Sequence, residues 1–453
     1  MPGFTSKHPL QMAIKTEITQ PKEAPSKRQM NGWLALSPLI VFLSVYLVSS
    51  VVARDFYRVP VAAAFIIASV YALAITKGFK GTDDKVAVFS RGAGSRNVLL
   101  MIWIFVLAGA FAATARDIGA IDATVAATLH LLPGRFIYAG LFLTACFVSM
   151  AIGTSVGTIV ALVPIASGIA TQTGTEIPFM TAIIVGGAFF GDNLSFISDT
   201  TVAATQTQGC GMRDKFKVNL WIALPAAIAV TILYVILGVN VHSEAIPQAA
   251  SWTGLIPYIM VIVLALCGMN VLTVLSLGIV VNGVIGWIQG TYGWVGWMAS
   301  IGGGIASMGE LIIVSLMAGG MLELIRHNGG LDFIIRALTR RISSKKGAYF
   351  SIAGLVSLVN FCTANNTISI LTTGPLAKDI SGRFGLDARK TASLLDTFSC
   401  LVQGIIPYGA QMLMASGLAG VSAVSITTRL FYPLALGLVA IASIALNFPK
   451  KYS

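Results

Sequence analysis

The sequence predicts an all-α polytopic membrane protein built from two inverted-topology repeats. Of its 453 residues, 56% are hydrophobic and only 11% are charged, whereas soluble proteins carry about 25% charged residues. Apolar runs close to the roughly 20 residues that a membrane-spanning helix needs recur from Trp33 to Asn447. We expect about ten full spans plus two re-entrant hairpins and broken helices, with no sizeable soluble domain.

The expected helices fall into two sets of similar order. We expect a disordered cytoplasmic tail over residues 1–32, a first transmembrane repeat over 33–240, an external linker over 241–254 and a second repeat over 255–453. The first repeat is expected to have spans at 33–52, 59–76, 98–115 and 218–240, a hairpin at 136–171 and an interrupted span at 179–205. The second is expected to have spans at 255–269, 271–288, 309–325 and 426–447, a hairpin at 347–377 and an interrupted span at 391–416.

Glycine and polar clusters divide the hairpins and the interrupted spans. The hairpins turn at residues 153–158 and 362–367, where small polar residues interrupt the apolar run. Irregular backbone at membrane depth is tolerated only where it is buried in protein or lines a cavity. Short amphipathic stretches at 121–129 and 331–338 are expected to lie flat at the membrane surface. The alternative counts each hairpin arm as a full span and gives about fourteen spans.

Matching residues support the repeat. Five residues recur 210 positions later: Ala108, Gly109, Arg116, Gly119 and Asp122 match Ala318, Gly319, Arg326, Gly329 and Asp332. The polar breaks of the two hairpins match at an offset of 209, and the carboxylates Asp192 and Asp396 match at an offset of 204. We therefore predict that Asp192 and Asp396 are counterparts in the two repeats.

The distribution of charge indicates that the repeats are inverted. The net charge is +12, but 25 of the 30 basic residues fall in six segments that one topology places on the same side. The positive-inside rule then puts both termini in the cytoplasm. Residues 116–135 include two basic residues and their counterparts 326–346 include six, so equivalent loops lie on opposite sides. Inverted repeats with broken helices at the midplane are typical of secondary transporters in the cytoplasmic membrane.

The segment from Gly186 to Thr201 carries two carboxylates in an apolar region. An acidic side chain at the bilayer centre costs about 2.5–3.5 kcal/mol on insertion scales, so it is expected to have a partner. Oxygen donors suit Na⁺, and the segment supplies them from Asp192, Asn193, Ser195, Ser198, Asp199 and Thr200. We expect Na⁺ to bind at Asp192 and Asp199. In the alternative, Asp199 or Thr200 caps the helix that resumes after the break, while Ser195 and Ser198 bond back to carbonyl groups. For Thr201, capping is the expected role.

Neutral oxygen donors gather at the hairpin turns and in the second interrupted span. The turns contain Thr154, Ser155 and Thr158 in one hairpin, and Thr363, Asn365, Asn366 and Thr367 in the other. The second interrupted span adds Asp396 and Ser399, which we predict to complete a midplane cation site. Asn and Thr can bind a cation without adding charge. Their alternative role is hydrogen bonding between helices, worth about 0.6–2 kcal/mol.

Acids outnumber bases within the apolar segments. Glu310 and Glu323 bound the span 311–322 and are candidates for gating or proton transfer, although Glu323 can equally pair with Arg326 at i,i+3. Apart from Arg429 near an edge, these segments contain no base, which favours a cationic cargo. Burial raises the pKa of a carboxylate, so protons compete with Na⁺ for the same oxygens. Such competition is sufficient for antiport.

The aspartate segment resembles the signature of a known family. Residues 187–201, Gly-Ala-Phe-Phe-Gly-Asp-Asn-Leu-Ser-Phe-Ile-Ser-Asp-Thr-Thr, are similar to the Gly-Ala-Tyr-Phe-Gly-Asp-Lys-Leu-Ser-Pro-Leu-Ser-Asp-Thr-Thr of NhaC-type Na⁺/H⁺ antiporters, within the ion transporter superfamily. Residues 319–323 and 406–410 also look like family segments. The resemblance implies a two-repeat hairpin fold, exchange of Na⁺ for H⁺, and ion-site roles for Asp192, Ser195, Ser198, Asp199 and Thr200.

Departures from that signature bear on the substrate. Asn193 stands where the pattern has Lys, and residues 196–197 are Phe-Ile where it has Pro-Leu. The loss of that lysine removes a positive charge beside Asp192. Related members exchange organic anions such as malate and lactate, or carry amino acids.

Exchange of Na⁺ for H⁺ across the cytoplasmic membrane is therefore the first functional prediction. The alternative is a Na⁺- or H⁺-coupled carrier of a small organic acid or amino acid, whose carboxylate would bind at hairpin amides and helix N-termini. An intramembrane aspartyl protease is disfavoured because the Tyr-Asp and Gly-x-Gly-Asp motifs are absent, and we expect no enzyme activity. The expected partners are Na⁺, H⁺ and membrane lipid, with no cofactor and no nucleic acid; a homodimer is left open.

Overall fold

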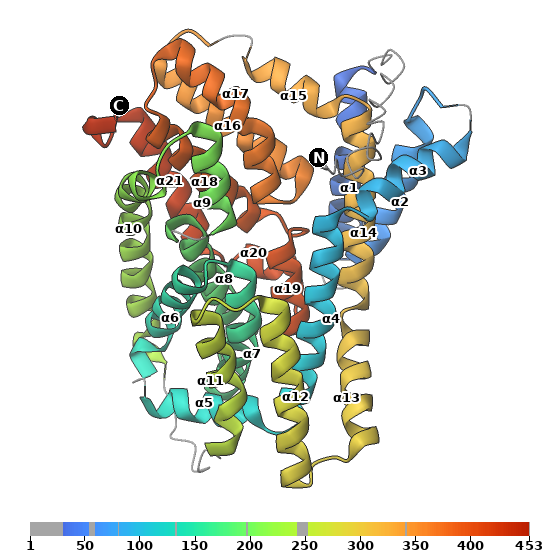
Figure 1. Ribbon diagram of the computed structural model, residues 1–453, viewed down its shortest axis with the longest axis vertical. Helices are drawn as coiled ribbons and strands as arrows, with labels where there is room; N and C mark the ends of the chain where they lie inside the picture. Colours follow the sequence, from blue (N-terminus) through green and yellow to red (C-terminus); the bar gives the residue numbers. More distant parts are fainter. Residues whose placement is uncertain are drawn as a thin grey trace, which may run out of the picture.

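The computed structural model describes residues 30–53, 59–79, 81–131, 134–195, 198–241, 252–339 and 342–452. Within these ranges the chain is helical and has no strand (Figure 1). Most of the tail expected over 1–32 and most of the linker expected over 241–254 lie outside the described residues.

Helices occupy the expected ranges of the first half. In chain order they are α1 Gly32–Ala53, α2 Val61–Ile75, α3 Thr82–Ala93, α4 Arg96–Asp117, α5 Ala120–Leu131, α6 Ile137–Ile152, α7 Ser155–Thr173, α8 Ile177–Leu194, α9 Asp199–Gln208 and α10 Met212–Leu237. The helices α6 and α7 form the first hairpin, and α8 and α9 form the first interrupted span.

The second half has a similar order of elements, with the short helix α20 (Ala423–Thr427) in addition. Its helices are α11 Trp252–Leu266, α12 Val271–Gln289, α13 Trp294–Ser307, α14 Gly309–His327, α15 Gly330–Thr339, α16 Lys345–Thr363, α17 Asn366–Phe384, α18 Ala388–Ile405, α19 Ala410–Ala419, α20 Ala423–Thr427 and α21 Phe431–Ala445. The helices α16 and α17 form the second hairpin, and α18 and α19 form the second interrupted span.

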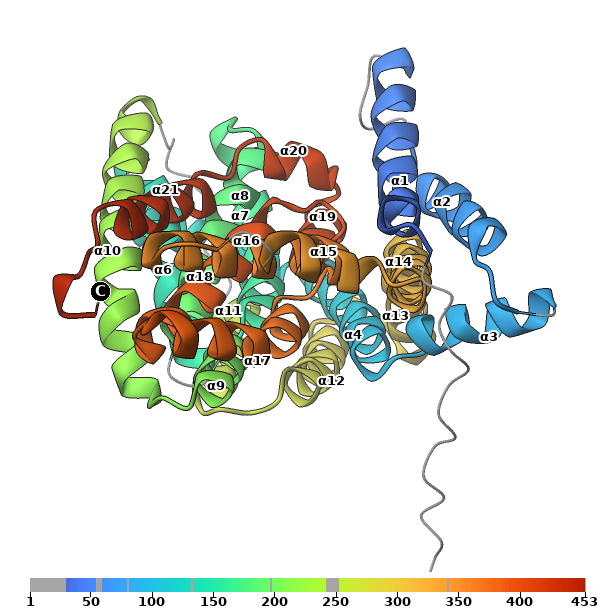
Figure 2. The same ribbon diagram turned by 90° about the horizontal axis from the view of Figure 1, so that it is seen from above.

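Two helices were not expected. The helix α3 lies in a charged stretch whose sequence indicates only a cluster of basic residues, and α13 lies just before the span expected at 309–325. The helix α13 contains Gly302, Gly303 and Gly304 in succession. Because glycine is about 1 kcal/mol less favourable than alanine in a helix, such a run does not suggest one. In the structure the chain bends by 41° at the break between α13 and α14. Both helices lie next to α4, as the view from above shows (Figure 2).

A single sequence offset relates the second hairpin arm and the broken helix of one half to those of the other. The helices α7, α8 and α9 have counterparts in α17, α18 and α19, and each counterpart begins 211 positions later. Left-handed glycines end two of these pairs at the same offset, Gly174 with Gly385 and Gly209 with Gly420. In Figure 1 the α6–α7 hairpin lies in the lower half of the molecule, while the α16–α17 hairpin lies in the upper half.

This register corrects one expectation. At an offset of 211 the counterpart of Asp192 is Gln403 rather than Asp396. The offset of 204 differs by seven residues, which is about two turns of an α-helix. The apolar face of a helix repeats at that interval, so a two-turn slip preserves the pattern of polar positions and is not detected in the sequence.

Glycines allow close contacts that connect the halves. A side-chain carbon added to Gly109 of α4 would lie 2.3 Å from the carbonyl oxygen of Gly304 of α13. One added to Gly92 of α3 would lie 2.3 Å from the carbonyl oxygen of Gly319 of α14. Small residues are typical where membrane helices pack this closely. The matching residues Gly109 and Gly319 therefore mark helix contacts.

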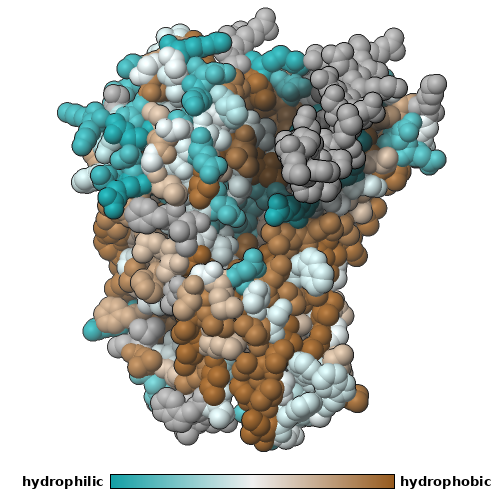
Figure 3. All heavy atoms as spheres, in the orientation of Figure 1, coloured by the Kyte–Doolittle hydropathy of each residue, from teal (hydrophilic) through white to brown (hydrophobic). Residues whose placement is uncertain are grey.

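Several helices are suited to cross a membrane. Among the described residues, eight helices are long and apolar enough to do so, or up to nine if the bent pair of α13 and α14 is one span. Six of the eight are among the ten expected full spans, and the other two are α6 and α7, the arms of the first hairpin. The expected spans at α2, α11 and α21 have only 15 residues each. Figure 3 shows hydrophobic residues over much of the middle and lower surface in this view, with hydrophilic residues gathered towards the upper end. The structure agrees with an all-helical membrane protein.

Candidate functional site

Both hairpin turns and both helix breaks meet at one cavity of about 200 Å³, which we call the Asp192 cavity. The helix α7 packs against α19, and α17 packs against α9, so each hairpin lies on the broken helix of the other half. The polar residues of the lining are Asn97, Thr154, Ser155, Asp192, Asp199, Thr200, Asn365, Asn366, Thr367, Gln403 and Gln411. Of the described residues that line it, only the two aspartates are charged.

Asp192 lies at the end of α8 and is 5% exposed. One of its carboxylate oxygens accepts a hydrogen bond from the backbone N–H of Ser155 at 2.8 Å, and the other accepts from the Ser155 hydroxyl at 2.5 Å. Gln411 of α19 donates to the same hydroxyl at 3.1 Å. The first residue of α7 thus holds the carboxylate at a helix N-terminus, where the helix dipole favours negative charge.

The break between α8 and α9 exposes backbone oxygen and places Asp199 across it. The carbonyl oxygen of Asp192 accepts hydrogen bonds from Ser198 at 2.7 Å and from Thr200 at 3.0 Å. Asp199 is the first residue of α9, is exposed and lines the cavity. Ser195 is buried at the end of α8, outside the cavity lining. The segment therefore presents two carboxylates and the Thr200 side chain to one space.

The capping residue differs from the one expected. The N-cap of α9 is Ser198, whose hydroxyl accepts a hydrogen bond from the backbone N–H of Thr201 at 3.3 Å. The hydroxyl of Thr201 instead accepts a hydrogen bond from the ammonium of Lys215 at 2.7 Å. The capping role predicted for Thr201 is therefore wrong, because its hydroxyl bonds to α10.

Behind the cavity lies a second polar cluster that contains a base. Lys215 is in the first turn of α10 and is 1% exposed, while Asp396 in the middle of α18 is fully buried. The Lys215 ammonium forms an ion pair with Asp396 and donates to the carbonyl oxygen of Asn193 at 2.7 Å. Asn193 also donates from its amide to Thr397 at 3.2 Å. The expectation of an interior without a base is wrong, because Lys215 extends inward from a basic segment that the charge pattern places among the cytoplasmic loops.

Two residues that were expected to complete the cation site lie outside the cavities. Asp396 and Ser399 line neither this cavity nor the neighbouring one described below. The Ser399 hydroxyl donates to the carbonyl oxygen of Asp396 at 2.9 Å, within their own helix. In this structure the carboxylate of Asp396 is therefore paired with the ammonium of Lys215.

A signal for Lys215 was present in the sequence. Asn219 follows it at i+4 and is fully buried, on the same face of α10 as Ile222, Ala223 and Ala226. Side chains four apart lie on one face of a helix. Asn219 donates to the Asn193 carbonyl oxygen at 2.7 Å, beside Lys215. A polar pair in line with the buried face of an apolar helix thus indicated an inward-pointing base.

The two hairpin turns bring the N-termini of α7 and α17 to the Asp192 cavity. Asn365 caps α17 by accepting from the backbone N–H of Ile368 at 2.9 Å, and Asn366 accepts from the N–H of Thr367 at 3.0 Å. Thr158 donates to the Thr154 carbonyl oxygen at 3.2 Å and is buried outside the cavity lining. The structure thus brings Thr154, Ser155, Asn365, Asn366 and Thr367 to the Asp192 cavity, and leaves Thr158 in the core.

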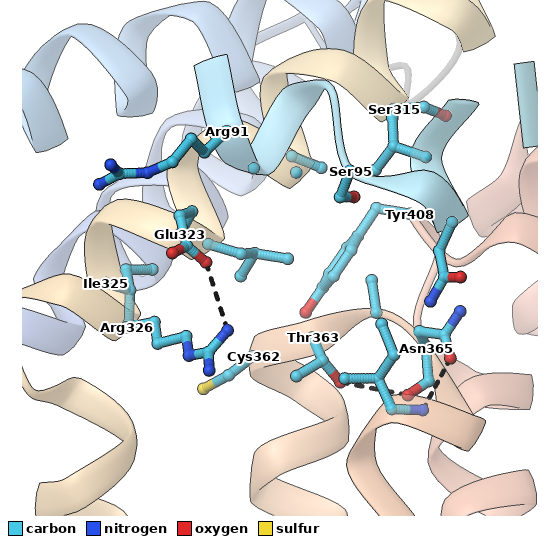
Figure 4. A pocket seen from close by; sticks show the side chains of 18 of the residues that line it. Arg91, Ser95, Ser315, Glu323, Ile325, Arg326, Cys362, Thr363, Asn365 and Tyr408 are labelled. Atoms are coloured by element: carbon cyan, nitrogen blue, oxygen red, sulfur yellow. Dashed lines mark hydrogen bonds and ion pairs between the residues drawn. The ribbon is translucent and has the colours of Figure 1, made fainter. Parts of the chain in front are cut away.

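A second cavity of about 360 Å³ adjoins the first, and we call it the Arg91 cavity. Both cavities are lined by Asn97, Met101 and Asn365. Figure 4 shows Arg91, Glu323 and Arg326 on one side of this cavity, and Thr363, Asn365 and Tyr408 on the other. The predicted site residue Thr363 faces this space and not the Asp192 cavity. The Arg91 cavity carries both signs of charge, unlike its neighbour.

The two predicted glutamates lie away from the Asp192 cavity. Glu323 lines the Arg91 cavity and pairs with Arg326 at 3.7 Å, in the i,i+3 arrangement. Glu310 is exposed at the start of α14 and lines neither cavity. One of its oxygens lies 3.5 Å from the backbone N–H of Ala62 in α2. Nothing in these contacts connects Glu310 to the paired aspartates.

Comparison with known proteins gives one family over nearly the whole chain. The family model described as "Na+/H+ antiporter family" matches residues 15–239 and 246–449. The malate-2H⁺/Na⁺-lactate antiporter of Bacillus subtilis is 24% identical over 86% of this chain and 90% of that protein. The Na⁺/H⁺ antiporter NhaC of Alkalihalophilus pseudofirmus is 22% identical over the same shares of the two chains.

One solved structure shows a weaker likeness. The structural match to the YdaH transporter of Alcanivorax borkumensis covers 91% of this chain and 99% of the transporter chain, with 13% sequence identity and a TM-score of 0.39. This likeness is too distant to carry an argument. The family match, by contrast, spans both halves, both hairpins and both helix breaks. The chain is therefore an integral membrane protein that belongs to the Na⁺/H⁺ antiporter family.

Proposed function

We propose that the protein exchanges Na⁺ for H⁺ across the cytoplasmic membrane, with both ions binding at the Asp192 cavity. One observation carries this proposal: the charged residues among the described lining of the cavity are Asp192 and Asp199 alone. Hydroxyl and amide groups of both hairpins and both breaks surround them. Carboxylate, hydroxyl and carbonyl oxygens are ligands for hard cations such as Na⁺.

Competition for Asp192 accounts for the exchange. The carboxylate receives two hydrogen bonds, both from Ser155, and its remaining lone pairs are available to a cation or a proton. A proton on Asp192 removes the charge that attracts Na⁺, and Na⁺ at the same oxygens displaces the proton. Exchange follows if the doubly empty site reorients poorly, because two uncompensated charges are costly inside a membrane.

The experiment uses everted vesicles that contain the protein and carry a preset pH gradient. Addition of Na⁺ should dissipate the gradient, and Asp192→Asn should abolish the response because it removes the charge that both ions share. Asp122→Asn is the matched control, since this aspartate lies on α5 and lines neither cavity. A wild-type protein that gives no response to Na⁺ would refute the proposal.

We also propose that the two halves are inverted repeats whose hairpins enter the membrane from opposite sides. The recurrence at 211 positions and the placement of the two hairpins at opposite ends support it. The amphipathic helices agree with it, since α5 lies across the lower end in Figure 1 and α15 lies near the upper end. The basic segments then place both termini in the cytoplasm. A cysteine introduced at Ser343 should be labelled only from the cytoplasm, and labelling from outside would overturn this orientation.

A second candidate is a carrier of a small organic acid coupled to Na⁺ or H⁺. The Arg91 cavity favours it, because Arg91 and Arg326 line a space that adjoins the Asp192 cavity. A guanidinium group suits a carboxylate, and a relative is a malate-2H⁺/Na⁺-lactate antiporter. Malate or lactate should then move protons in vesicles that do not respond to Na⁺ alone.

A further inference from the structure

The buried Lys215 makes contacts on both sides of the first helix break. Its ammonium donates to the carbonyl oxygen of Asn193, at the end of α8, and to the hydroxyl of Thr201, in the first turn of α9. Both distances are 2.7 Å. An ammonium has three donors, and the third is directed at Asp396 of α18. One side chain thus joins both parts of a broken helix and a helix of the other half.

These contacts lie next to the proposed ion site without entering it. Asn193 follows Asp192 in the chain, and Thr201 follows Thr200. Asp192 and Thr200 line the cavity, whereas Lys215, Asn193 and Thr201 do not. The ammonium therefore contacts the neighbour of each cavity residue, in addition to the direct hydrogen bond from Thr200 to the Asp192 carbonyl oxygen at 3.0 Å.

A second residue of α10 contacts the same carbonyl group. Asn219 donates to the carbonyl oxygen of Asn193 at 2.7 Å and to its side-chain oxygen at 3.0 Å. The side-chain oxygen of Asn219 accepts a hydrogen bond from Ser393 of α18. The carbonyl group at the end of α8, which the break deprives of its helical partner, is satisfied by α10 instead.

The partner of Lys215 explains why a charge can occupy this place. An ammonium without a counter-ion is strongly unfavourable in a buried site, and Asp396 supplies the opposite charge. Asp396 is fully buried and outside the cavity lining. The pair therefore adds no net charge to the neighbourhood of Asp192 and Asp199.

We propose that Lys215 is a positioning residue that holds α8 and α9 together at the break, with Asp396 as its anchor on α18. The pair fixes Asp192 and Thr200 in the geometry that binds the cation. The transport part of this proposal rests on the proposed function, whereas the structural part does not.

The test uses a double variant that removes both charges together. Lys215→Met keeps an unbranched side chain that is one atom shorter and uncharged, and Asp396→Asn prevents an unpaired carboxylate from unfolding the protein. Hydrogen–deuterium exchange of the full-length protein should become faster in peptides over residues 190–205. Peptides over residues 402–412, which cover the second break, should be unchanged. Equal exchange in the double variant and the wild type over residues 190–205 would overturn the proposal.

Transport by the same double variant separates positioning from general stability. The concentration of Na⁺ at half-maximal exchange should rise by about 10- to 100-fold, the usual effect of losing a residue that orients a ligand. The maximal rate should change much less. An unchanged half-saturating concentration would contradict the positioning role. If the wild type shows no exchange with Na⁺, the proposed function fails, and the deuterium measurement still decides the structural part.

Lys390→Met is the matched control. Lys390 is a fully buried lysine at the start of the same helix α18, and its ammonium lies 5.0 Å from the centre of the Tyr349 ring. Tyr349 belongs to α16, the first arm of the second hairpin. Its loss should leave both the hydrogen–deuterium exchange over residues 190–205 and the half-saturating Na⁺ concentration at the wild-type values. A change as large as that of the double variant would show that the loss of any buried lysine has this effect.

Discussion

The two broken helices have the same backbone register and different chemistry. The α8–α9 break is bridged by the charged Lys215 from a neighbouring helix, and it presents Asp192 and Asp199 to the cavity. Both breaks also have direct hydrogen bonds across them. At the first break, Ser198 and Thr200 donate to the Asp192 carbonyl oxygen. At the α18–α19 break, Gln403 donates to the side-chain oxygen of Gln411 at 2.9 Å, and among the described residues this second break is bridged by neutral groups alone. Gln403 also donates to the Ala364 carbonyl oxygen at the turn of the second hairpin, at 3.0 Å.

This difference between the two breaks agrees with the proposed cation site. A site for one cation needs carboxylates on one side only, and neutral oxygens on the other can complete it without adding repulsion. The first break supplies the charge and the second supplies amides. Asp396, which looked like the second acid of the site, neutralises the lysine of the first break instead.

The largest expected effect comes from removing one charge of the Lys215–Asp396 ion pair beside the first break. Lys215→Met alone should destabilise the protein by about 3–5 kcal/mol, because Asp396 then remains buried without a partner. Thermal unfolding of the purified protein measures this effect. The double variant Lys215→Met with Asp396→Asn should regain most of the loss, and failure to regain it would show that the charge pair is not the cause.

The corresponding change at the second break should be milder. Gln403→Leu removes the donor to Gln411 and to Ala364, and leaves those two acceptors unsatisfied at a cost of about 1–3 kcal/mol. The same unfolding measurement applies. A loss equal to that of Lys215→Met would contradict the contrast between a charged and a neutral bridge.

The two aspartates of the first break should also differ. Asp199→Asn should raise the half-saturating Na⁺ concentration by about fivefold and leave exchange detectable, because this exposed carboxylate is screened by water. Asp192→Asn should leave no exchange to measure. Initial rates over a range of Na⁺ concentrations in vesicles test this order, and equal effects at both positions would remove the distinction.

The smallest expected effect lies at the Arg91 cavity. Arg326→Gln breaks an ion pair whose arginine side chain is 70% exposed, so stability should fall by less than about 1 kcal/mol. Exchange of Na⁺ for H⁺ should be unchanged. A selective loss of malate- or lactate-driven proton movement in this variant would instead favour the second candidate function.

Much of this architecture could be predicted from the sequence. The apolar lengths and polar breaks indicated most of the helices, both hairpins and the meeting of their turns, because these depend on local patterns. The glycine-rich α13 was missed, since its helix is stabilised by packing on α4 and not by propensity. Lys215 was missed because counting charges by loop treats every lysine as solvated, although four methylene groups let an ammonium reach inward.

Proton release on Na⁺ binding tests the central claim most directly. The purified protein is held in a weakly buffered detergent solution with a pH-sensitive dye, and Na⁺ is added as the chloride with choline chloride as the salt control. If one cation and one proton compete at Asp192, the wild type should release protons in a saturable manner and Asp192→Asn should release none. Absence of release from the wild type, or equal release from the variant, would contradict the account.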